Sequence, residues 1–199
     1  MIPGPRLPTL HADRVALRWL VPSDVAALYA VFSDADVMRY GSRPPFTEEH
    51  QARAYLADIE RYFEQKTLFQ WGVARREDDL VIGTCTLFSV DASNLRAEVG
   101  YALGRNHWGK GLMKEALVRL FDFAFEELGL RRLEADVDPR NARSVALLEK
   151  LGFRREGYLR ERWFVSGEVQ DALFYGLLRR EWDASERGLT PGAAGSPPS

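Results

Sequence analysis

The segment from Glu98 to Ala116, EVGYALGRNHWGKGLMKEA, constrains the fold of this 199-residue chain more than any other. A strand is predicted up to Leu103, and a helix with a 3/4 apolar spacing is predicted from Met113 onward. Only a short, basic, glycine-rich loop separates the two. Such a junction leaves backbone N–H groups free at the positive end of a helix, which suits a phosphate or pyrophosphate ligand. A tight turn that merely needs glycine at positive φ is the alternative.

Two known nucleotide-binding motifs fit this loop poorly. In a P-loop, GxxxxGK[ST], Lys110 follows Gly109 at the correct spacing, but Gly111 stands where Ser or Thr must bind magnesium. The dinucleotide fingerprint GxGxxG needs a third glycine where Lys114 stands, and it usually lies in the first βα turn. Both motifs are therefore disfavoured.

The remaining pattern predicts an α/β fold of the α+β type, with a mixed, mostly antiparallel central sheet of about seven strands flanked by about four helices. Expected strands are 15–20, 69–75, 80–89, 96–103, 133–137, 153–164 and 169–179, and residues 38–46 form a loop. Helices are expected after Pro22, from Thr47, from Met113 and from Asn141, with Ser23, Thr47 and Asn141 as N-caps and Gly129 and Gly152 as ends.

Composition excludes several classes of protein. Twenty-seven Lys and Arg against 29 Asp and Glu give a net charge of -2, which argues against a general binder of nucleic acid or membrane surfaces. The single cysteine, Cys85, cannot form an intramolecular disulfide, is expected to be buried and inert, and makes a cysteine-based metal site nearly impossible. His11, His50 and His107 show no metal-ligand spacing, so no metal is expected. No apolar run reaches the roughly 20 residues of a membrane span, so we expect a cytoplasmic protein.

The chain is expected to form one domain over residues 1–183. Its last segment, GLTPGAAGSPPS, is rich in small residues, proline and glycine and nearly free of large apolar side chains. Such a composition is typical of disordered chain, so residues 184–199 are expected to be a disordered tail.

Three separated blocks of sequence carry a resemblance to a known family. They read GYALGRNHWGKGLMKEAL, then FAFEELGLRRLEADVDPRNARSVALLEKLGF, and finally YGLLRREW. In this order and spacing they resemble the GNAT superfamily of N-acetyltransferases, in particular its RimJ/RimL-like branch, over about residues 10–182. The resemblance implies a GNAT fold, acetyl-CoA as cosubstrate and an amine as acceptor. Homodimers are common in that family, although the sequence identifies no interface.

The resemblance also implies which residues bind acetyl-CoA. In the family, the loop matching 108–113 wraps the pyrophosphate with backbone amides, although Trp108 replaces a common Gln or Arg and Met113 a common Gly or Ala. The expected residues of this segment are His107, Trp108, Gly109, Lys110, Gly111, Leu112 and Met113. The strand matching 99–103 splays from its neighbour and pairs with pantetheine through Tyr101, Ala102 and Leu103. Asn141 matches an asparagine that contacts the pantetheine arm, with N-capping alone as the alternative, and Ser144 follows one turn later.

Acetyl transfer requires a neutral amine. At pH 7, removing a proton costs roughly 1.4 kcal/mol for an α-amino group and roughly 4.6 kcal/mol for a lysine side chain, so a modest base serves the first. Glu98 is the candidate base, acting through water, because it shares a strand face with Gly100 and Ala102 and points away from the apolar positions. It also matches an acidic residue common in the family. A solvated glutamate paired with Arg96 or a neighbouring strand is the alternative.

A proton donor for the leaving thiolate is harder to identify. Many members of the family use a tyrosine where this chain has Leu148. Ser144, which matches a serine used in the RimJ/RimL branch, is the leading substitute, ahead of Tyr158 and Tyr175. Local backbone bonding is the alternative role for this serine.

The acceptor is expected to approach between the loop 38–46 and the turn near 163–168, as the family's architecture implies. Candidate acceptor-binding residues are Tyr40, Arg43, Phe46, Trp163, Phe164 and Asp171, the last of which could instead brace the turn. The expected acceptor is the α-amine of a protein N-terminus. The alternatives are a small amine, such as an aminoglycoside, polyamine or amino acid, and a non-catalytic module that binds acyl-CoA.

Overall fold

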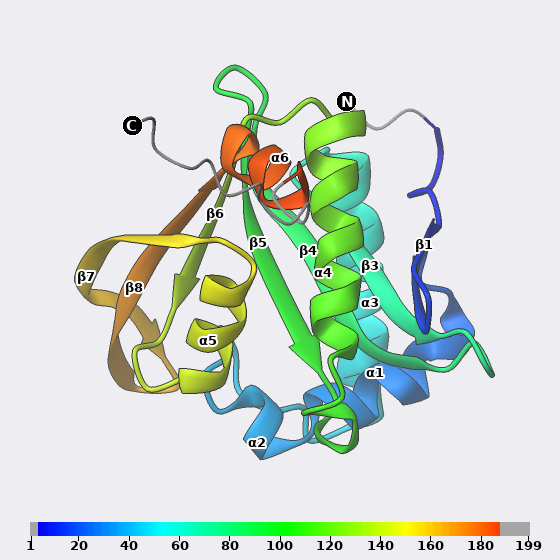
Figure 1. Ribbon diagram of the computed structural model, residues 1–199. Helices are drawn as coiled ribbons and strands as arrows, with labels where there is room; N and C mark the ends of the chain where they lie inside the picture. The colour runs from blue at the N-terminus through cyan, green and yellow to red at the C-terminus, as the bar shows by residue number, and fades with distance from the viewer. Residues whose placement is uncertain (1–3, 188–199) are drawn as a thin grey trace, which may run out of the picture.

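A single eight-stranded sheet organises the computed structural model, which describes residues 4–187 (Figure 1). Its spatial order is β1-β2-β3-β4-β5-β6-β8-β7, and every neighbouring pair is antiparallel except β5 and β6. The strands are β1 (Leu10–His11), β2 (Val15–Arg18), β3 (Leu68–Arg75), β4 (Val81–Asp91), β5 (Arg96–Leu103), β6 (Arg132–Val137), β7 (Arg154–Val165) and β8 (Glu168–Leu178). The predicted mixed, mostly antiparallel sheet is confirmed, and β1 is the strand added to the expected seven.

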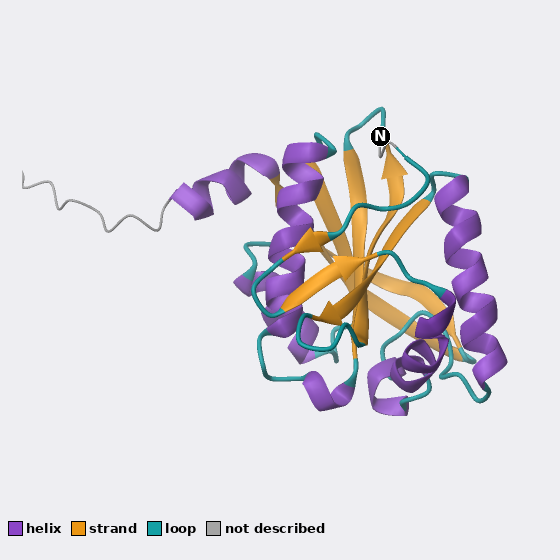
Figure 2. Ribbon diagram, turned by 90° about the vertical axis from the view of Figure 1, so that its right-hand side faces the viewer, coloured by secondary structure: helices purple, strands orange, loops and turns teal. Residues whose placement is uncertain are grey.

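Helices cover both faces of this sheet (Figure 2). They are α1 (Val25–Phe32), α2 (Ala35–Met38), α3 (Glu49–Glu64), α4 (Leu112–Asp122), α5 (Ala142–Lys150) and α6 (Arg179–Arg187), with a π-helical turn at Phe123–Glu127 after α4. The larger apolar cluster joins the sheet to α4, α5 and α6, and a smaller one joins it to α1, α2 and α3. Of the described helices, none is long and apolar enough to cross a membrane.

Two helix starts differ from the prediction. Asp24, not Ser23, stabilises the first, because its carboxylate accepts a hydrogen bond from the Val21 amide at 2.8 Å. The next helix begins at Glu49, and the Gln51 side chain accepts from the amides of Thr47 (2.7 Å) and Glu48 (3.0 Å). The polar side chain three residues beyond the cap decides the start, as in a capping box.

The ends of the chain also differ from the prediction. Helix α6 extends to Arg187, so residues 184–187 are helical instead of tail. Trp182 on this helix is buried, and its indole donates to Asp122 at the end of α4 (2.9 Å). That contact docks α6, which the sequence pattern did not predict. The rest of the expected tail, 188–199, lies outside the described residues.

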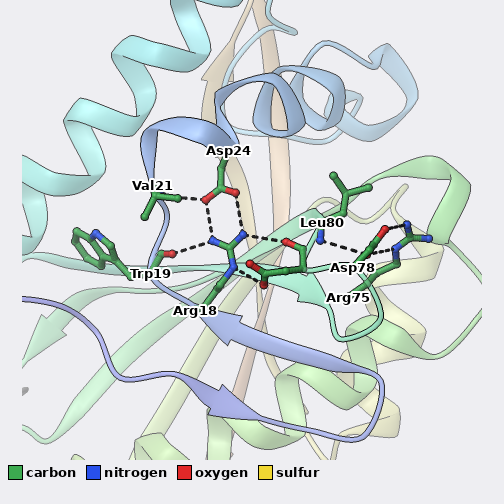
Figure 3. A network of polar contacts seen from close by, with 8 residues as sticks. Arg18, Trp19, Val21, Asp24, Arg75, Asp78 and Leu80 are labelled. Atoms are coloured by element: carbon green, nitrogen blue, oxygen red, sulfur yellow. Dashed lines mark hydrogen bonds and ion pairs between the residues drawn. The ribbon is translucent and has the colours of Figure 1, made fainter.

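A buried ion pair ties the N-terminal strand to the first helical segment. Arg18 donates from both terminal nitrogens to the two carboxylate oxygens of Asp24, at 2.8 and 2.9 Å (Figure 3). Its Nε reaches the Asp79 carboxylate in the β3–β4 turn at 2.8 Å. The hydrogen bond to Asp24 raises the pKa of the Arg18 guanidinium above its usual value. One side chain therefore fixes three segments that are distant in sequence.

The sheet opens in its middle. Strands β5 and β6 pair in parallel only from Arg96 with Arg132 to Glu98 with Glu134. Beyond Glu98 the two strands separate toward their C-terminal ends, with α5 beside the gap (Figure 1). This opening exposes strand backbone at the centre of the sheet.

Candidate active site

A cavity of about 450 Å³ lies at the opening between β5 and β6. Its walls come from β5, β6, α5, α3, the loop after α2 and the β7–β8 hairpin. Of the predicted site residues it brings together Glu98, Tyr101, Ala102, Asn141, Ser144, Tyr40, Arg43, Trp163 and Asp171. Residues chosen from four separate stretches of sequence thus meet in one place.

The β5 wall presents backbone groups on alternate residues. The Gly104 amide donates to Ile82 of β4 at 2.8 Å, and the register pairs Ala102 with Thr84 and Leu103 with Gly83. Because antiparallel pairing alternates, the N–H and C=O groups of Ala102 point to β4, whereas those of Tyr101 and Leu103 point into the gap. The expected backbone role of Ala102 is therefore wrong, and this residue lines the cavity instead.

Trp108 closes one end of this wall. Its indole N–H donates to the Leu103 carbonyl at 2.7 Å. The guanidinium of Arg143, in the first turn of α5, lies over the Trp108 ring at 4.5 Å from its centroid. This contact joins the loop before α4 to α5 and places a cation near the start of both helices.

The glycine-rich loop ends in a left-handed residue at the start of α4. Gly109 has φ +74° and Gly111, the N-cap, has φ +77°. The first helical hydrogen bond runs from the Glu115 amide to the Gly111 carbonyl at 3.1 Å, so the amides of the three preceding helical residues have no acceptor within the helix. The predicted free N–H groups are therefore present. The side chains of Leu112 and Met113 are buried in the core, which leaves only their backbone for a ligand.

His107 and Lys110 face a different cavity. They lie with Arg14, Arg75 and Arg76 around a hollow of about 510 Å³ on another part of the surface. Partial burial, and then the charges of Arg75 and Lys110, lower the pKa of His107. The structure thus separates these two side chains from the β5–β6 cavity.

A pair of hydroxyl groups spans the gap from β5 to α5. The Tyr101 hydroxyl lies 2.6 Å from Ser144 Oγ, and burial raises the pKa of Tyr101 to about 12. The Ser144 amide donates to Asn141 Oδ1 at 3.2 Å, so Asn141 caps α5 as its residue type predicts. Leu148 lines the cavity nearby. Tyr158 and Tyr175 are absent from this lining and bond to Asp171 and Glu149 instead.

Glu98 is the last residue of β5 that pairs with β6, and β5 and β6 separate beyond it. Burial raises the pKa of its carboxyl group, with smaller contributions from Asp136 and Glu134, while a hydrogen bond with Ser89 opposes the shift. Ser89 has φ +49° within the irregular stretch between Phe88 and Asp91 where β4 and β5 lose register. A bulge in the neighbouring strand thus supplies the polar contact to Glu98.

Two predicted acceptor-side residues lie elsewhere. Phe46 is buried in the smaller core cluster, with its ring 5.7 Å from that of Phe32 and 5.9 Å from that of Tyr55. It is Tyr55 that lines the cavity, where its hydroxyl bonds to Gln70 and Arg43 lies over its ring. Phe164 is 74% exposed and points away from the cavity, because its neighbours on the strand, Trp163 and Val165, occupy the inner face.

Asp171 supports the β7–β8 hairpin. It accepts hydrogen bonds from the Tyr158 hydroxyl and from the Glu161 amide, the latter at 2.7 Å. Glu161 has φ +53° where β7 and β8 lose register between Leu159 and Trp163. These bonds lower the pKa of Asp171 and fix the bulge that turns Trp163 toward the cavity.

The sequence analysis missed three groups in or beside this site. Asp136 lines the cavity from β6, Tyr55 lines it from α3, and Arg143 lies over Trp108. Asp136 had a signal in the sequence, since it alternates with the apolar residues Ala135 and Val137 on a predicted strand. Tyr55 and Arg143 lie on helical faces whose orientation depends on tertiary packing.

Comparison with known proteins agrees with this geometry. The model of an acetyltransferase (GNAT) domain matches residues 14–154. The uncharacterized N-acetyltransferase p20 of Bacillus licheniformis is 40% identical over 174 residues, which cover 87% of this chain and 98% of that protein. The ribosomal protein uS5-alanine N-acetyltransferase of Escherichia coli (strain K12) is 28% identical over 188 residues, which cover 91% and 94%.

Solved structures show the same fold. The crystal structure of the GNAT-family acetyltransferase from Bacillus anthracis matches with a TM-score of 0.78 at 25% identity and covers 87% of this chain and 100% of its own. Spermidine N-acetyltransferase from Vibrio cholerae, in complex with CoA and spermine, matches with a TM-score of 0.74 at 22% identity and covers 85% and 98%. The family model, the relatives and the open sheet lead to one conclusion: the chain belongs to the GNAT family of acetyltransferases and is an acyltransferase enzyme.

Proposed function

We propose that this enzyme transfers the acetyl group of acetyl-CoA directly to the α-amine of a protein N-terminus, within a ternary complex. The observation that carries the proposal is the cavity between β5 and β6, which holds a carboxylate, Glu98, together with a hydroxyl pair, Tyr101 and Ser144. The E. coli relative named for acetylating a ribosomal protein alanine supports a protein acceptor.

The residues present fit acetyl-CoA. The free amides at the start of α4, preceded by a glycine in the left-handed region, suit the pyrophosphate. The backbone of Tyr101 in the open gap suits the amide groups of pantetheine, and Arg143 adds a positive charge beside Trp108. When bound, acetyl-CoA supplies the thioester whose acetyl group is transferred.

Two proton transfers accompany the reaction. A bond forms between the acceptor nitrogen and the acetyl carbon, and the bond from that carbon to sulfur breaks. Glu98 accepts the proton that the amine loses, through a water molecule, and its burial suits it to this role because burial raises its pKa. Ser144 donates a proton to the leaving sulfur and regains one from Tyr101, which is protonated at neutral pH because its pKa lies near 12. Tyr101 is then reprotonated from water and Glu98 releases its proton to water, so both groups return to their starting states.

The basicity of the acceptor favours an α-amine. Neutralising a lysine side chain at pH 7 costs roughly 3 kcal/mol more than neutralising an α-amino group. A single carboxylate acting through water suits the less demanding substrate.

A small polyamine is the second candidate acceptor. Carboxylates at several points of the cavity favour a molecule with more than one positive charge, namely Asp58, Glu98, Asp136, Asp138 and Asp171. The Vibrio cholerae structure with spermine shares the fold.

The test is release of free thiol from acetyl-CoA across a panel of acceptors. The panel holds peptides beginning with Ser, Ala, Thr or Met, their N-acetylated forms, polyamines, aminoglycosides and free amino acids. Turnover of the free peptides alone supports the proposal, and turnover of small amines alone replaces it with the second candidate. Binding of acetyl-CoA without turnover of any amine would point to a non-catalytic module.

A further inference from the structure

Asp136 holds a carboxylate oxygen without a partner. Its side chain is 8% exposed, and Oδ2 accepts a hydrogen bond from Arg162 Nε at 2.9 Å. Across the residues that the structure describes, 4–187, Asp136 Oδ1 is the buried side-chain oxygen or nitrogen with no hydrogen-bond partner. A buried oxygen left without a hydrogen bond destabilises the protein, so binding of a ligand that donates to this oxygen is favoured.

Asp136 lines the cavity that holds the groups proposed to react. Register pairs Glu98 with Glu134, and Asp136 follows two residues later on the same face of β6. Asp136 lines the same cavity as Glu98, and its charge contributes to the raised pKa of Glu98. The two carboxylates thus face one space where the strands separate.

Neighbouring carboxylates are already paired. Asp138 accepts from the Arg140 side chain, Asp171 from Tyr158 and Glu161, and Glu134 from Arg96 and Arg132. Each of their carboxylate oxygens therefore already accepts a hydrogen bond within the protein. Asp136 differs because one oxygen is held by Arg162 while the other remains available.

We propose that Asp136 Oδ1 binds the ammonium group of the acceptor and so selects a cationic primary amine at this point of the cavity. This inference rests on the proposed acetylation of an amine, but it holds for a peptide α-amine and for a polyamine alike. An ammonium has three donors and a full positive charge, which match one free carboxylate oxygen beside a second carboxylate. Asp136 holds the amine at the mouth of the gap, and Glu98 then receives its proton.

The experiment measures binding without turnover. The enzyme is saturated with CoA, which has no acetyl group to transfer, and a tetrapeptide beginning with Ala is titrated calorimetrically at pH 7; spermidine is titrated in parallel. Asp136→Asn keeps an oxygen for Arg162 and removes the charge. We expect it to weaken binding of the free-amine probe about 10- to 100-fold while leaving the affinity for acetyl-CoA unchanged.

Two controls separate binding from folding. Glu127→Gln also removes one negative charge, but Glu127 lies outside the cavity lining, is 53% exposed and pairs with Arg119 at 3.5 Å, so affinity should change less than twofold. The N-acetylated peptide, which lacks the ammonium, should bind wild type and Asp136→Asn equally. Asp136→Glu restores the charge and should regain part of the affinity.

Each outcome bears on the inference. Equal affinity of wild type and Asp136→Asn for every free amine overturns it. So does a loss that extends equally to the N-acetylated peptide and acetyl-CoA, because that result indicates a structural role. If wild type binds spermidine but no peptide, the proposal of a protein N-terminus as acceptor is wrong. The role of Asp136 is then decided by the ratio of the spermidine affinities of wild type and Asp136→Asn.

Discussion

Glu98 is the residue on which the proposed chemistry depends most. Glu98→Gln keeps the shape of the side chain but cannot accept a proton, so kcat should fall about 100-fold or more. The affinity for acetyl-CoA, measured calorimetrically, should stay within twofold of wild type. An unchanged kcat in this variant would remove Glu98 as the base.

The same residue predicts a dependence on pH. Glu98 works only when deprotonated, and burial raises its pKa above the usual value for glutamate. As pH falls through that raised pKa, kcat should decline, and the decline should begin at a higher pH than an exposed glutamate would give. The residual kcat of Glu98→Gln, measured with saturating substrates, should not show this decline at low pH. If kcat of the variant still declines at low pH, the group whose protonation lowers kcat is not Glu98.

The hydroxyl pair gives a second test at the scale of single residues. Ser144→Ala and Tyr101→Phe each interrupt the path from Tyr101 to the leaving sulfur, and each should lower kcat with little change in affinity for acetyl-CoA. Groups that act as one unit are not additive, so the double variant should lose about as much as the worse single variant. Multiplying losses would show that the two hydroxyls act independently.

Single residues also mark the limit of what the sequence could predict. Strand alternation indicated the face that Glu98 occupies, and the family resemblance pointed to Ser144; both residues line the cavity. The prediction that Phe46 binds the acceptor was wrong, because an aromatic side chain after a loop is as well suited to a core as to a cavity wall. In the folded protein Phe46 packs in the core, and Tyr55 lines the cavity. The free oxygen of Asp136 could not be predicted, since it depends on where Arg162 lies in three dimensions.

At the scale of elements, acetyl-CoA binding is expected to be most sensitive to a side chain added at the start of α4. Gly111→Asp introduces a Cβ at φ +77° and a carboxylate beside the free amides that would hold a phosphate. Affinity for acetyl-CoA should fall at least about 100-fold, because like charges placed together cost several kcal/mol.

Gly129 offers the matched control for that substitution. It follows the π-helical turn after α4, has φ +69°, and has open space where a Cβ would be added. Gly129→Asp should impose a comparable backbone strain, seen as a lower melting temperature, without affecting acetyl-CoA binding. Equal losses of binding in the two variants would indicate that strain alone is responsible.

The elements themselves were largely predictable from periodicity. The meander β3 to β5, the helix α4 and the strand β6 lie within one or two residues of expectation, because long amphipathic patterns leave few alternatives. Short elements were not predictable. Strand β1 has two residues and helix α2 has four, and such lengths carry no periodic signal. Two helices start at other residues than predicted, because several polar residues near each start can cap it. The side chains of Asp24 and Gln51 make the capping hydrogen bonds.

At the scale of the whole molecule, the buried pair of Arg18 and Asp24 connects the sheet to the layer of α1 to α3. That layer supplies Tyr40, Arg43 and Tyr55 to the cavity. Asp24→Ala would leave the Arg18 guanidinium largely buried without its main partner, which costs about 3–5 kcal/mol. Thermal unfolding should show a decrease on the order of 10 °C.

A surface ion pair provides the comparison for that loss. Arg75 and Asp78 pair in the neighbouring turn (Figure 3), where their side chains are 30% and 42% exposed, against 17% and 8% for Arg18 and Asp24. Asp78→Asn should leave the melting temperature unchanged within error, since exposed pairs contribute little. Equal effects of the two substitutions would show that the Arg18 pair does not hold the layers together.

The measurement that bears most directly on the proposed function is the site of acetylation on one peptide with two kinds of amine. The peptide begins with Ala and contains an internal lysine, and the product is mapped by fragmentation mass spectrometry after incubation with enzyme and acetyl-CoA. Acetyl on the α-nitrogen alone, formed by wild type and lost in Glu98→Gln, is the predicted result. Acetyl on the lysine side chain, or no product from a protein that turns over only small amines, would contradict it.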